Sequence, residues 1–212
     1  MIANARNLLN AAVVSMGIGL SGVASADPLA IQIFDPNAAI SGFPPPYAQV
    51  TYDLVDSNTA TFTLVTFAPY VVFGNTTLGL SFSGAVSLNG VISGNSSCAN
   101  PYSAGGGGNI SEFGTFNFDI GTFNGPSCGS TSISFMVDLD SGSWADTAAI
   151  LVANSDGFLA AAHICSTTDA CKLTGFAGGD TSVPPDEIPE PHTLALIALG
   201  LLGLAFSRRK QG

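Results

Sequence analysis

Positive charge is almost absent from the middle of this chain. The 212 residues include five Lys and Arg against 15 Asp and Glu, and the formal net charge at pH 7 is −10. Between Asp27 and Arg208 the only cation is Lys172. A segment with this balance repels phosphate backbones and anionic lipid headgroups, because both are negatively charged. We therefore expect neither nucleic acid nor an anionic lipid surface as a partner of this segment.

Charged residues of either sign are also scarce. They make up 9% of the chain, whereas about a quarter is usual for a globular protein. The surface must therefore be built largely from Ser, Thr, Asn and Gly. Such a surface is compatible with a hydrated polysaccharide layer.

The chain has no apolar run as long as an ordinary membrane span. The C-terminal run Leu194–Phe206 has about 13 apolar or glycine residues, which cover roughly 20 Å as a helix, against the roughly 30 Å of a bilayer core. Pro189 and Pro191 prevent that helix from extending backwards. Arg208, Arg209 and Lys210 follow it and should stay cytoplasmic. We expect a short transmembrane helix that leaves the preceding chain outside.

The N-terminal end has the pattern of a signal peptide. Arg6 precedes an apolar run, Ala11–Val23, and Ala24-Ser25-Ala26 has the small-x-small pattern of a cleavage site. We expect a signal peptide over residues 1–26 with cleavage before Asp27. A short N-terminal membrane anchor is the alternative. The formal GxGxxG within this run lacks a preceding strand, so it does not indicate a dinucleotide site.

A family resemblance rests on the order of features at the C-terminal end. Pro189-Glu190-Pro191, the Leu/Gly/Ala-rich run and Arg208-Arg209-Lys210 together resemble the PEP-CTERM sorting signal of Gram-negative bacteria. His192 departs from the small residue that members often carry there. The resemblance implies that a membrane-embedded exosortase processes the protein near Pro-Glu-Pro. Transient inner-membrane association would then precede delivery to the cell surface or to an exopolysaccharide matrix, and exopolysaccharide is a candidate partner.

Cysteine is rare, and its count is even. The four cysteines are Cys98, Cys128, Cys165 and Cys171, which permit three disulfide pairings outside the cytoplasm. We favour Cys98–Cys128 and Cys165–Cys171, because each pair flanks one loop-like segment. A zinc site is the alternative, but it lacks a C-x2-C pair and has only His163 nearby. We expect no metal and no cofactor.

Residues 27–182 read as one all-β domain. Short runs rich in Thr, Val, Ile and Phe alternate in polarity and are separated by Gly/Asn/Ser/Pro clusters. These runs are Gln49–Tyr52, Thr61–Leu64, Phe116–Ile120, Ser132–Phe135 and Val137–Asp140. We predict a single antiparallel β-sandwich, jelly-roll-like, between the signal peptide and the C-terminal hydrophobic helix. Residues 183–212 would form the linker and the sorting segment.

Four local features of the chain are open to prediction. Asn89-Gly90 indicates a hairpin turn. Ala104–Asn109 reads as a flexible glycine-rich loop, and no Lys-Ser/Thr follows it to make a phosphate cradle. Ala145–Val152 is the one segment that could form a short helix, and we interpret it as a strand after a turn. Residues 181–188 read as the linker to the tail.

One motif suggests an enzyme. Gly125–Gly129 matches G-x-S-x-G, and the order Ser127, then Asp138 or Asp156, then His163 is that of an α/β-hydrolase. No helix pattern follows the serine, and the motif arises readily by chance in a chain rich in Gly and Ser. We therefore expect a non-enzymatic protein. A secreted serine hydrolase ranks third, after the two functions given below.

Two further groups have a structural explanation. Trp144 and His163 lie in segments that are similar to the closing part of many PEP-CTERM proteins of unknown function, which makes both structural candidates first. Asp138, Asp140 and Asp146 crudely resemble calcium-ligand spacing but lack the later glutamate of an EF-hand.

We expect a structural or adhesive role in an extracellular polysaccharide layer. The runner-up is a carbohydrate- or ice-binding module.

Overall fold

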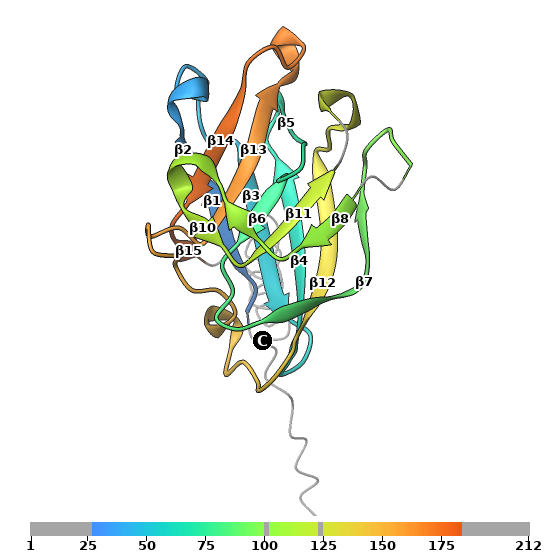
Figure 1. The fold of residues 1–212 in the computed structure, drawn as a ribbon, viewed down its shortest axis with the longest axis vertical. Helices are drawn as coiled ribbons and strands as arrows, with labels where there is room; N and C mark the ends of the chain where they lie inside the picture. The colour runs from blue at the N-terminus through green and yellow to red at the C-terminus, as the bar shows by residue number, and fades with distance from the viewer. Residues whose placement is uncertain (1–26, 100–101, 123–124, 184–212) are drawn as a thin grey trace, which may run out of the picture.

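The protein folds into two antiparallel β-sheets. The computed structural model describes residues 27–99, 102–122 and 125–183. A six-stranded sheet has the order β15-β1-β3-β4-β12-β7 (Figure 1). Its strands in that order are β15 Ser182–Val183, β1 Leu29–Ile33, β3 Ala48–Leu54, β4 Thr59–Thr66, β12 Ser132–Leu139 and β7 Val86–Gly94.

The second sheet has seven strands. Its order is β2-β14-β13-β6-β11-β8, and β5 pairs with β13. These strands are β2 Asp35–Pro36, β14 Thr174–Gly179, β13 Ala160–Ser166, β6 Leu78–Leu80, β11 Phe118–Thr122, β8 Tyr102–Gly105 and β5 Tyr70–Val72. A two-stranded ribbon, β9 Gly108–Asn109 with β10 Thr115–Phe116, completes the strands that the structure describes.

Helical structure in the described ranges is limited to single 3-10 turns. They are η1 Ala38–Ile40, η2 Ser111–Phe113, η3 Pro126–Cys128, η4 Thr147–Ala149 and η5 Thr167–Asp169. The prediction of an all-β, antiparallel sandwich is confirmed.

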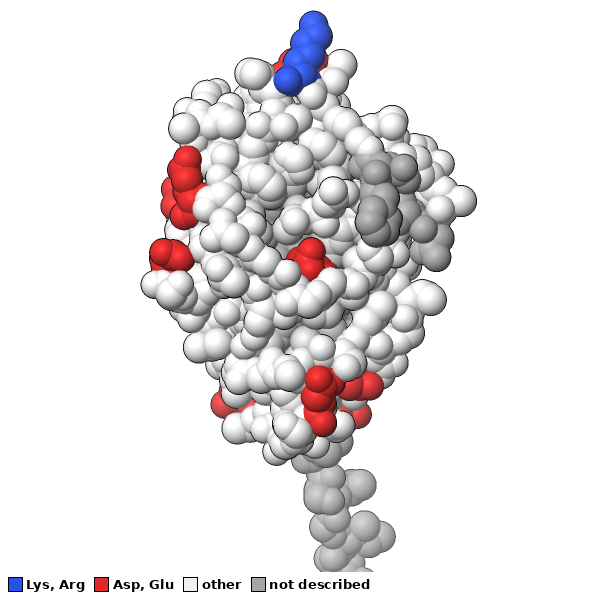
Figure 2. Space-filling view, in the orientation of Figure 1, with Lys and Arg blue, Asp and Glu red and all other residues white. Residues whose placement is uncertain are grey.

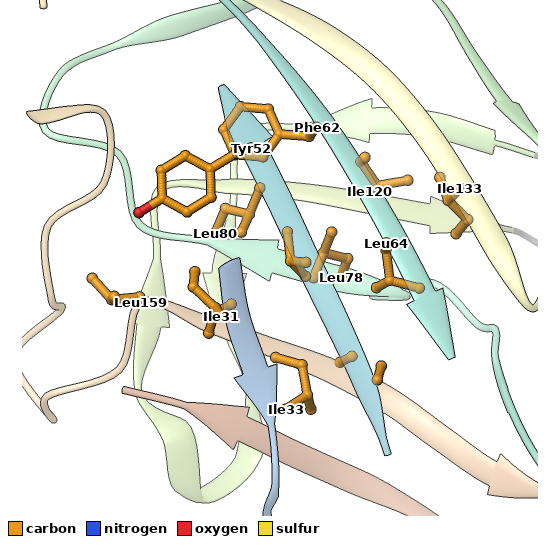
Figure 3. Packing of buried hydrophobic residues seen from close by; sticks show 14 of the residues in the cluster. Ile31, Ile33, Tyr52, Phe62, Leu64, Leu78, Leu80, Ile120, Ile133 and Leu159 are labelled. Atoms are coloured by element: carbon orange, nitrogen blue, oxygen red, sulfur yellow. The ribbon is translucent and has the colours of Figure 1, made fainter. Parts of the chain in front are cut away.

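The core lies between the two sheets and follows from the alternation of the strands. In β12, and in β4 from Ala60 onward, the residues alternate between buried positions and half-buried or exposed ones. Figure 3 shows Phe62 and Leu64 of the six-stranded sheet packed toward Leu78 and Leu80 of the other. Burying a side chain of this size stabilises the fold by about 1.5–3 kcal/mol. Local alternation therefore decides which face of each strand enters the core.

Aromatic rings link the two sheets at the centre of this core. Phe62 stacks on Tyr52 with ring centroids 5.5 Å apart and on Phe135 at 5.1 Å, all within the six-stranded sheet. Phe62 also meets Phe82 edge to face at 5.4 Å. Phe82 in turn contacts Phe118 of β11 at the same separation. Such pairs add about 0.5–1.5 kcal/mol each beyond their buried area.

A flap formed by β9, η2 and β10 covers the outer face of the seven-stranded sheet. Ile110, Phe113 and Phe116 of this flap pack on Ala161 of β13 as a second apolar cluster. Glycines in the sheet make room for it: a β-carbon at Gly178 would lie 2.5 Å from Phe113 Cδ1 and 2.8 Å from Phe158 Cδ1. The glycine-rich stretch near residue 178 is therefore a packing requirement of the flap.

The strand predicted over Phe116–Ile120 is wrong in one respect, because it is two strands. Phe116 in β10 faces the flap cluster, whereas Phe118 and Ile120 in β11 face the main core. The break falls at Asn117, whose side chain accepts from the Phe82 N–H at 2.8 Å and donates to the Phe82 carbonyl at 2.9 Å. The side-chain amide of Asn117 thus makes with the backbone of Phe82 the two hydrogen bonds that a neighbouring strand would otherwise make.

Three further local predictions also differ from the structure. Asn89-Gly90 is not a hairpin turn, since both residues lie inside β7. Ala145–Val152 forms no strand: it contains η4, which Asp146 caps by accepting from the Ala149 N–H at 3.0 Å. The segment expected to be a flexible loop, Ala104–Asn109, contains the end of β8 and all of β9, and the Gly107 N–H between them donates to Asp119 at 3.0 Å.

The last two described residues pair with the sandwich. Ser182 and Val183, assigned by the sequence to the start of the linker region, form β15 and pair with β1. The pairing extends the six-stranded sheet by one short edge strand. Residues 184–188 of the predicted linker lie outside the described residues.

Candidate functional site

A row of hydroxyl groups crosses the outer face of the six-stranded sheet. Thr51 of β3 is paired with Thr63 of β4, Thr63 with Ser134 of β12, and Ser134 with Ser93 of β7. Their chain neighbours point into the core, so these side chains point outward. The Thr63 and Ser134 hydroxyl oxygens are 3.2 Å apart. Spacing across such a row is about 4.8 Å per strand.

A bulge in the edge strand β7 interrupts the sheet beside this row. Ser93 pairs with Ser134 and Asn89 with Met136, so three residues of β7 face the single residue of β12 between those partners. Gly90 supplies the positive φ of +84° that the bulge requires. The hairpin predicted at Asn89-Gly90 is therefore wrong, and the glycine serves a bulge within β7 instead.

The bulge opens a hollow of about 400 Å³ on the outer face of the sheet. The residues that line it include Thr61, Asn89, Val91, Ser93, Ser134 and Met136. Hydroxyl and amide groups thus surround a thioether and a valine side chain that is 77% exposed. A surface of this kind can hydrogen-bond hydroxyl groups while packing against apolar C–H groups. Sequence reasoning missed this hollow, because it depends on the pairing of three separate strands.

Asn89 at the rim of the hollow is held by a carboxylate. Its amide nitrogen donates to the two oxygens of Asp138 at 2.9 and 3.0 Å, and the Thr59 hydroxyl donates to the same carboxylate at 2.8 Å. With the nitrogen held by Asp138, the Asn89 carbonyl oxygen is the atom left to accept from a ligand. The carboxylate therefore orients the amide.

The three aspartates considered for calcium bind separate donors. Asp138 binds Asn89 and Thr59, Asp140 accepts from the Ser87 hydroxyl at 2.6 Å, and Asp146 caps η4. In the ranges that the structure covers, no group of three His, Cys, Asp or Glu side chains is placed to hold a metal ion.

The four cysteines form two disulfides, Cys98–Cys128 and Cys165–Cys171. These are the two pairs favoured by the sequence. The first joins the segment after β7 to η3, and the second closes the loop that contains η5. Their Cα atoms are 5.3 and 5.0 Å apart, within the usual range for a disulfide.

The residues of the hydrolase motif do not assemble. Ser127 is exposed in η3, and the next element is the strand β12, so no helix begins at the serine. Asp138 binds Thr59 and Asn89, and Asp156 accepts from the Ser155 hydroxyl at 3.2 Å. Among the described residues, no hydrogen bond joins the His163 ring to any of these three side chains. The strand–turn–helix context that the motif requires is missing here.

The ring of His163 lies between two phenylalanines on the outer face of the seven-stranded sheet. Its centroid is 4.2 Å from that of Phe73 and 4.5 Å from that of Phe176, and both contacts are stacked. Burial lowers the pKa of His163 from its ordinary value of 6.5, and a hydrogen bond with the backbone of Phe73 acts in the opposite direction. Stacking and burial favour the neutral ring, which gives this histidine a packing role.

Trp144 also has a packing role. It is buried in the main core, its Nε1 donates to the Ser83 hydroxyl at 3.1 Å, and its backbone N–H donates to the Ser57 carbonyl at 2.7 Å. These contacts fasten the segment after β12 to the segment between β6 and β7 and to the β3–β4 turn.

Comparison with known proteins adds a finding about the C-terminal end. A family model described as the PEP-CTERM protein-sorting motif matches residues 187–210. The chain carries a PEP-CTERM sorting motif. The match includes Pro189-Glu190-Pro191 and Arg208-Arg209-Lys210, as the sequence predicts, and it covers none of the sandwich. Searches of curated proteins and of solved structures found no match.

The PEP-CTERM motif implies export, processing by an exosortase in the membrane, and sorting to the cell surface or the extracellular space. The sorting residues lie outside the described residues, as do Ala24 and Ala26 of the predicted cleavage site. The predicted transmembrane helix at 194–206 also lies there. Within the residues that the structure describes, no helix is long and apolar enough to cross a membrane.

Proposed function

We propose that this PEP-CTERM protein is a non-catalytic, adhesive component of the cell surface or its polysaccharide matrix. The hollow on the six-stranded sheet is the observation that carries the proposal. It combines hydroxyl and amide groups with the apolar surfaces of Met136 and Val91. A saccharide ring offers the matching groups, because its hydroxyls surround C–H faces.

Charge favours a neutral saccharide over an acidic one. No charged side chain lines the hollow, but the carboxylates of Asp138 and Asp140 lie beside it, on β12 and just after it, and bind Asn89 and Ser87 of β7. In the face seen in Figure 2, acidic side chains are scattered over a mostly uncharged surface. Lys172 is the only Lys or Arg in the described ranges, so uronic acids and sulfated sugars would find almost no counter-charge.

The hydroxyl row gives less support to ice binding. It extends through Thr51, Thr63, Ser134 and Ser93, but the adjoining rows carry Val65 and Met136. A face that matches a crystal lattice needs hydroxyls repeated in two dimensions, and this row repeats in one. We therefore favour the saccharide over ice.

The test is binding of the exported protein to immobilised neutral and acidic polysaccharides. Asn89→Ala and Thr61→Trp should each weaken binding to the neutral polymer, the first by removing an acceptor and the second by filling the hollow. Thr115→Ala, at the exposed position of β10, is the matched control and should bind as the parent does. Equal binding of all three variants would place any saccharide site elsewhere, and absence of binding by the parent protein would refute the function.

A further inference from the structure

The first and last described strands leave the sandwich at the same end. β1 and β15 are antiparallel neighbours, with Ala30 opposite Val183 and Ile31 opposite Ser182. The start of β1 at Leu29 and the end of β15 at Val183 therefore lie side by side at one edge of the six-stranded sheet (Figure 1). Residue 184, which leads toward the sorting motif, must leave from this end.

Two loops at that end define a surface that we call the exit pole. Strand register places there the β3–β4 turn, residues 55–58, and the segment after β12, residues 140–146. The Leu139 N–H donates to the Asn58 carbonyl at 2.8 Å, and the Trp144 N–H donates to Ser57. The exit pole is therefore a packed surface around the ends of β1 and β15.

The opposite end of the sandwich, the far pole, carries other loops. β4 runs away from the exit pole to Thr66, and Thr167 in η5 donates its N–H to the Pro69 carbonyl at 2.9 Å just beyond it. The segment after η1, which contains Gly42, precedes the start of β3 at this same end.

The length of chain between β15 and the sorting motif limits the distance to the processing enzyme. The matched motif begins at residue 187 and Pro189 is six positions after Val183. Six extended residues span at most about 20 Å. An enzyme that holds the chain at Pro189 must therefore come within about 20 Å of Val183, and it meets the exit pole first.

We propose that the exit pole is the surface that the folded protein presents to the exosortase during processing. The enzyme is a better occupant than the lipid surface, because the exit pole carries Asp56, Asp140 and Asp146 and no described Lys or Arg. Lys172, the one described cation, lies next to η5 at the far pole. The inference rests on the sorting motif and is independent of saccharide binding.

A bulky label placed at either end of the sandwich tests the proposal. Ser57→Cys places a thiol on the exit pole, and Gly42→Cys places one on the far pole, where a β-carbon meets nothing within 4 Å. Both full-length variants are labelled from outside with a polyethylene glycol maleimide, in spheroplasts whose exosortase is induced afterwards. We expect the label at position 57 to slow loss of the tail by about tenfold or more, because misplaced substrates react slowly. The label at position 42 should leave the rate unchanged.

A longer stem separates crowding from misfolding. Inserting about 12 Gly/Ser residues after Val183 adds up to about 40 Å of reach and should restore processing of the variant labelled at position 57. Equal rates for the two labelled variants would overturn the proposal. A block at position 57 that the longer stem does not relieve would overturn it as well.

Discussion

The side-chain amide of Asn89 donates to both carboxylate oxygens of Asp138, across the pairing of β7 with β12. The contact fastens the bulged edge strand to the sheet just beside the hollow. It joins a neutral donor to a charged acceptor, which makes it stronger than a hydrogen bond between neutral groups. Stability and the shape of the hollow therefore depend on the same pair.

Replacing Asn89 should destabilise the protein measurably. Asn89→Ala removes the donor from a half-buried carboxylate and should lower the free energy of unfolding by about 1–2 kcal/mol. Asn89→Asp should cost more at neutral pH, because it places a second carboxylate against Asp138. Urea unfolding measures both. Asn109→Ala, on the exposed β9, is the control and should change little; a similar loss there would contradict this account.

The flap requires a glycine in β14. Gly178→Ala puts a methyl group against Phe113 and Phe158, and overpacking of this kind costs about 1–3 kcal/mol. Gly108→Ala is the matched control, since a β-carbon there meets nothing within 4 Å and its φ is not positive. Thermal unfolding of the two variants should separate them, and equal melting temperatures would refute the packing argument.

Stability should fall in mild acid because of His163. Its pKa is lowered in the folded state, so below its ordinary value of 6.5 the unfolded chain binds more protons than the folded one, and acid favours unfolding. The contribution is complete above that value and is lost as the pH falls toward the folded pKa. Melting temperatures between about pH 8 and about pH 5 measure it. His163→Phe keeps a ring between Phe73 and Phe176 and should reduce the change of melting temperature with pH. If that change is the same in the variant, the pH dependence comes from other groups.

The two disulfides should contribute unequally to the free energy of unfolding. Cys98–Cys128 joins residues 30 positions apart and Cys165–Cys171 residues 6 apart. By loop entropy alone, the double Ala variants should lose about 3.5 and about 2 kcal/mol respectively. Non-reducing peptide mapping of exported protein should show both pairs and no free thiol. Four free thiols in that material would contradict oxidation after export.

Processing should remove both ends of the precursor. We expect mature surface protein to begin at Asp27 and to lack residues beyond about Pro191. Replacing Pro189-Glu190-Pro191 with alanines should leave export intact and retain full-length protein in the inner membrane. Intact-mass measurement decides between these states. Surface protein that still ends in Arg208-Arg209-Lys210 would refute the sorting prediction.

The sequence predicts those parts of the fold that depend on local periodicity. Thr61–Leu64 and Ser132–Phe135 alternate because one face of each strand is buried, and that alternation is visible in the chain alone. Asn117 ends a strand by binding Phe82, which is 35 positions away, so no local pattern indicates the break. The hollow escapes prediction for the same reason: Gly90 requires a positive φ in either a turn or a bulge, and only the partner strand decides between them.

The two edges of the six-stranded sheet have different attachments. β15 leads into the C-terminal tail, and the hollow lies toward the opposite edge, lined by residues of β4, β12 and β7. If the chain after β15 is held and a polymer pulls at the hollow, the tension crosses the strands between them at right angles to their length. Hydrogen-bond ladders loaded in that direction open one after another, whereas ladders loaded along the strands must break together. As a mechanical link, the domain would therefore yield gradually under load.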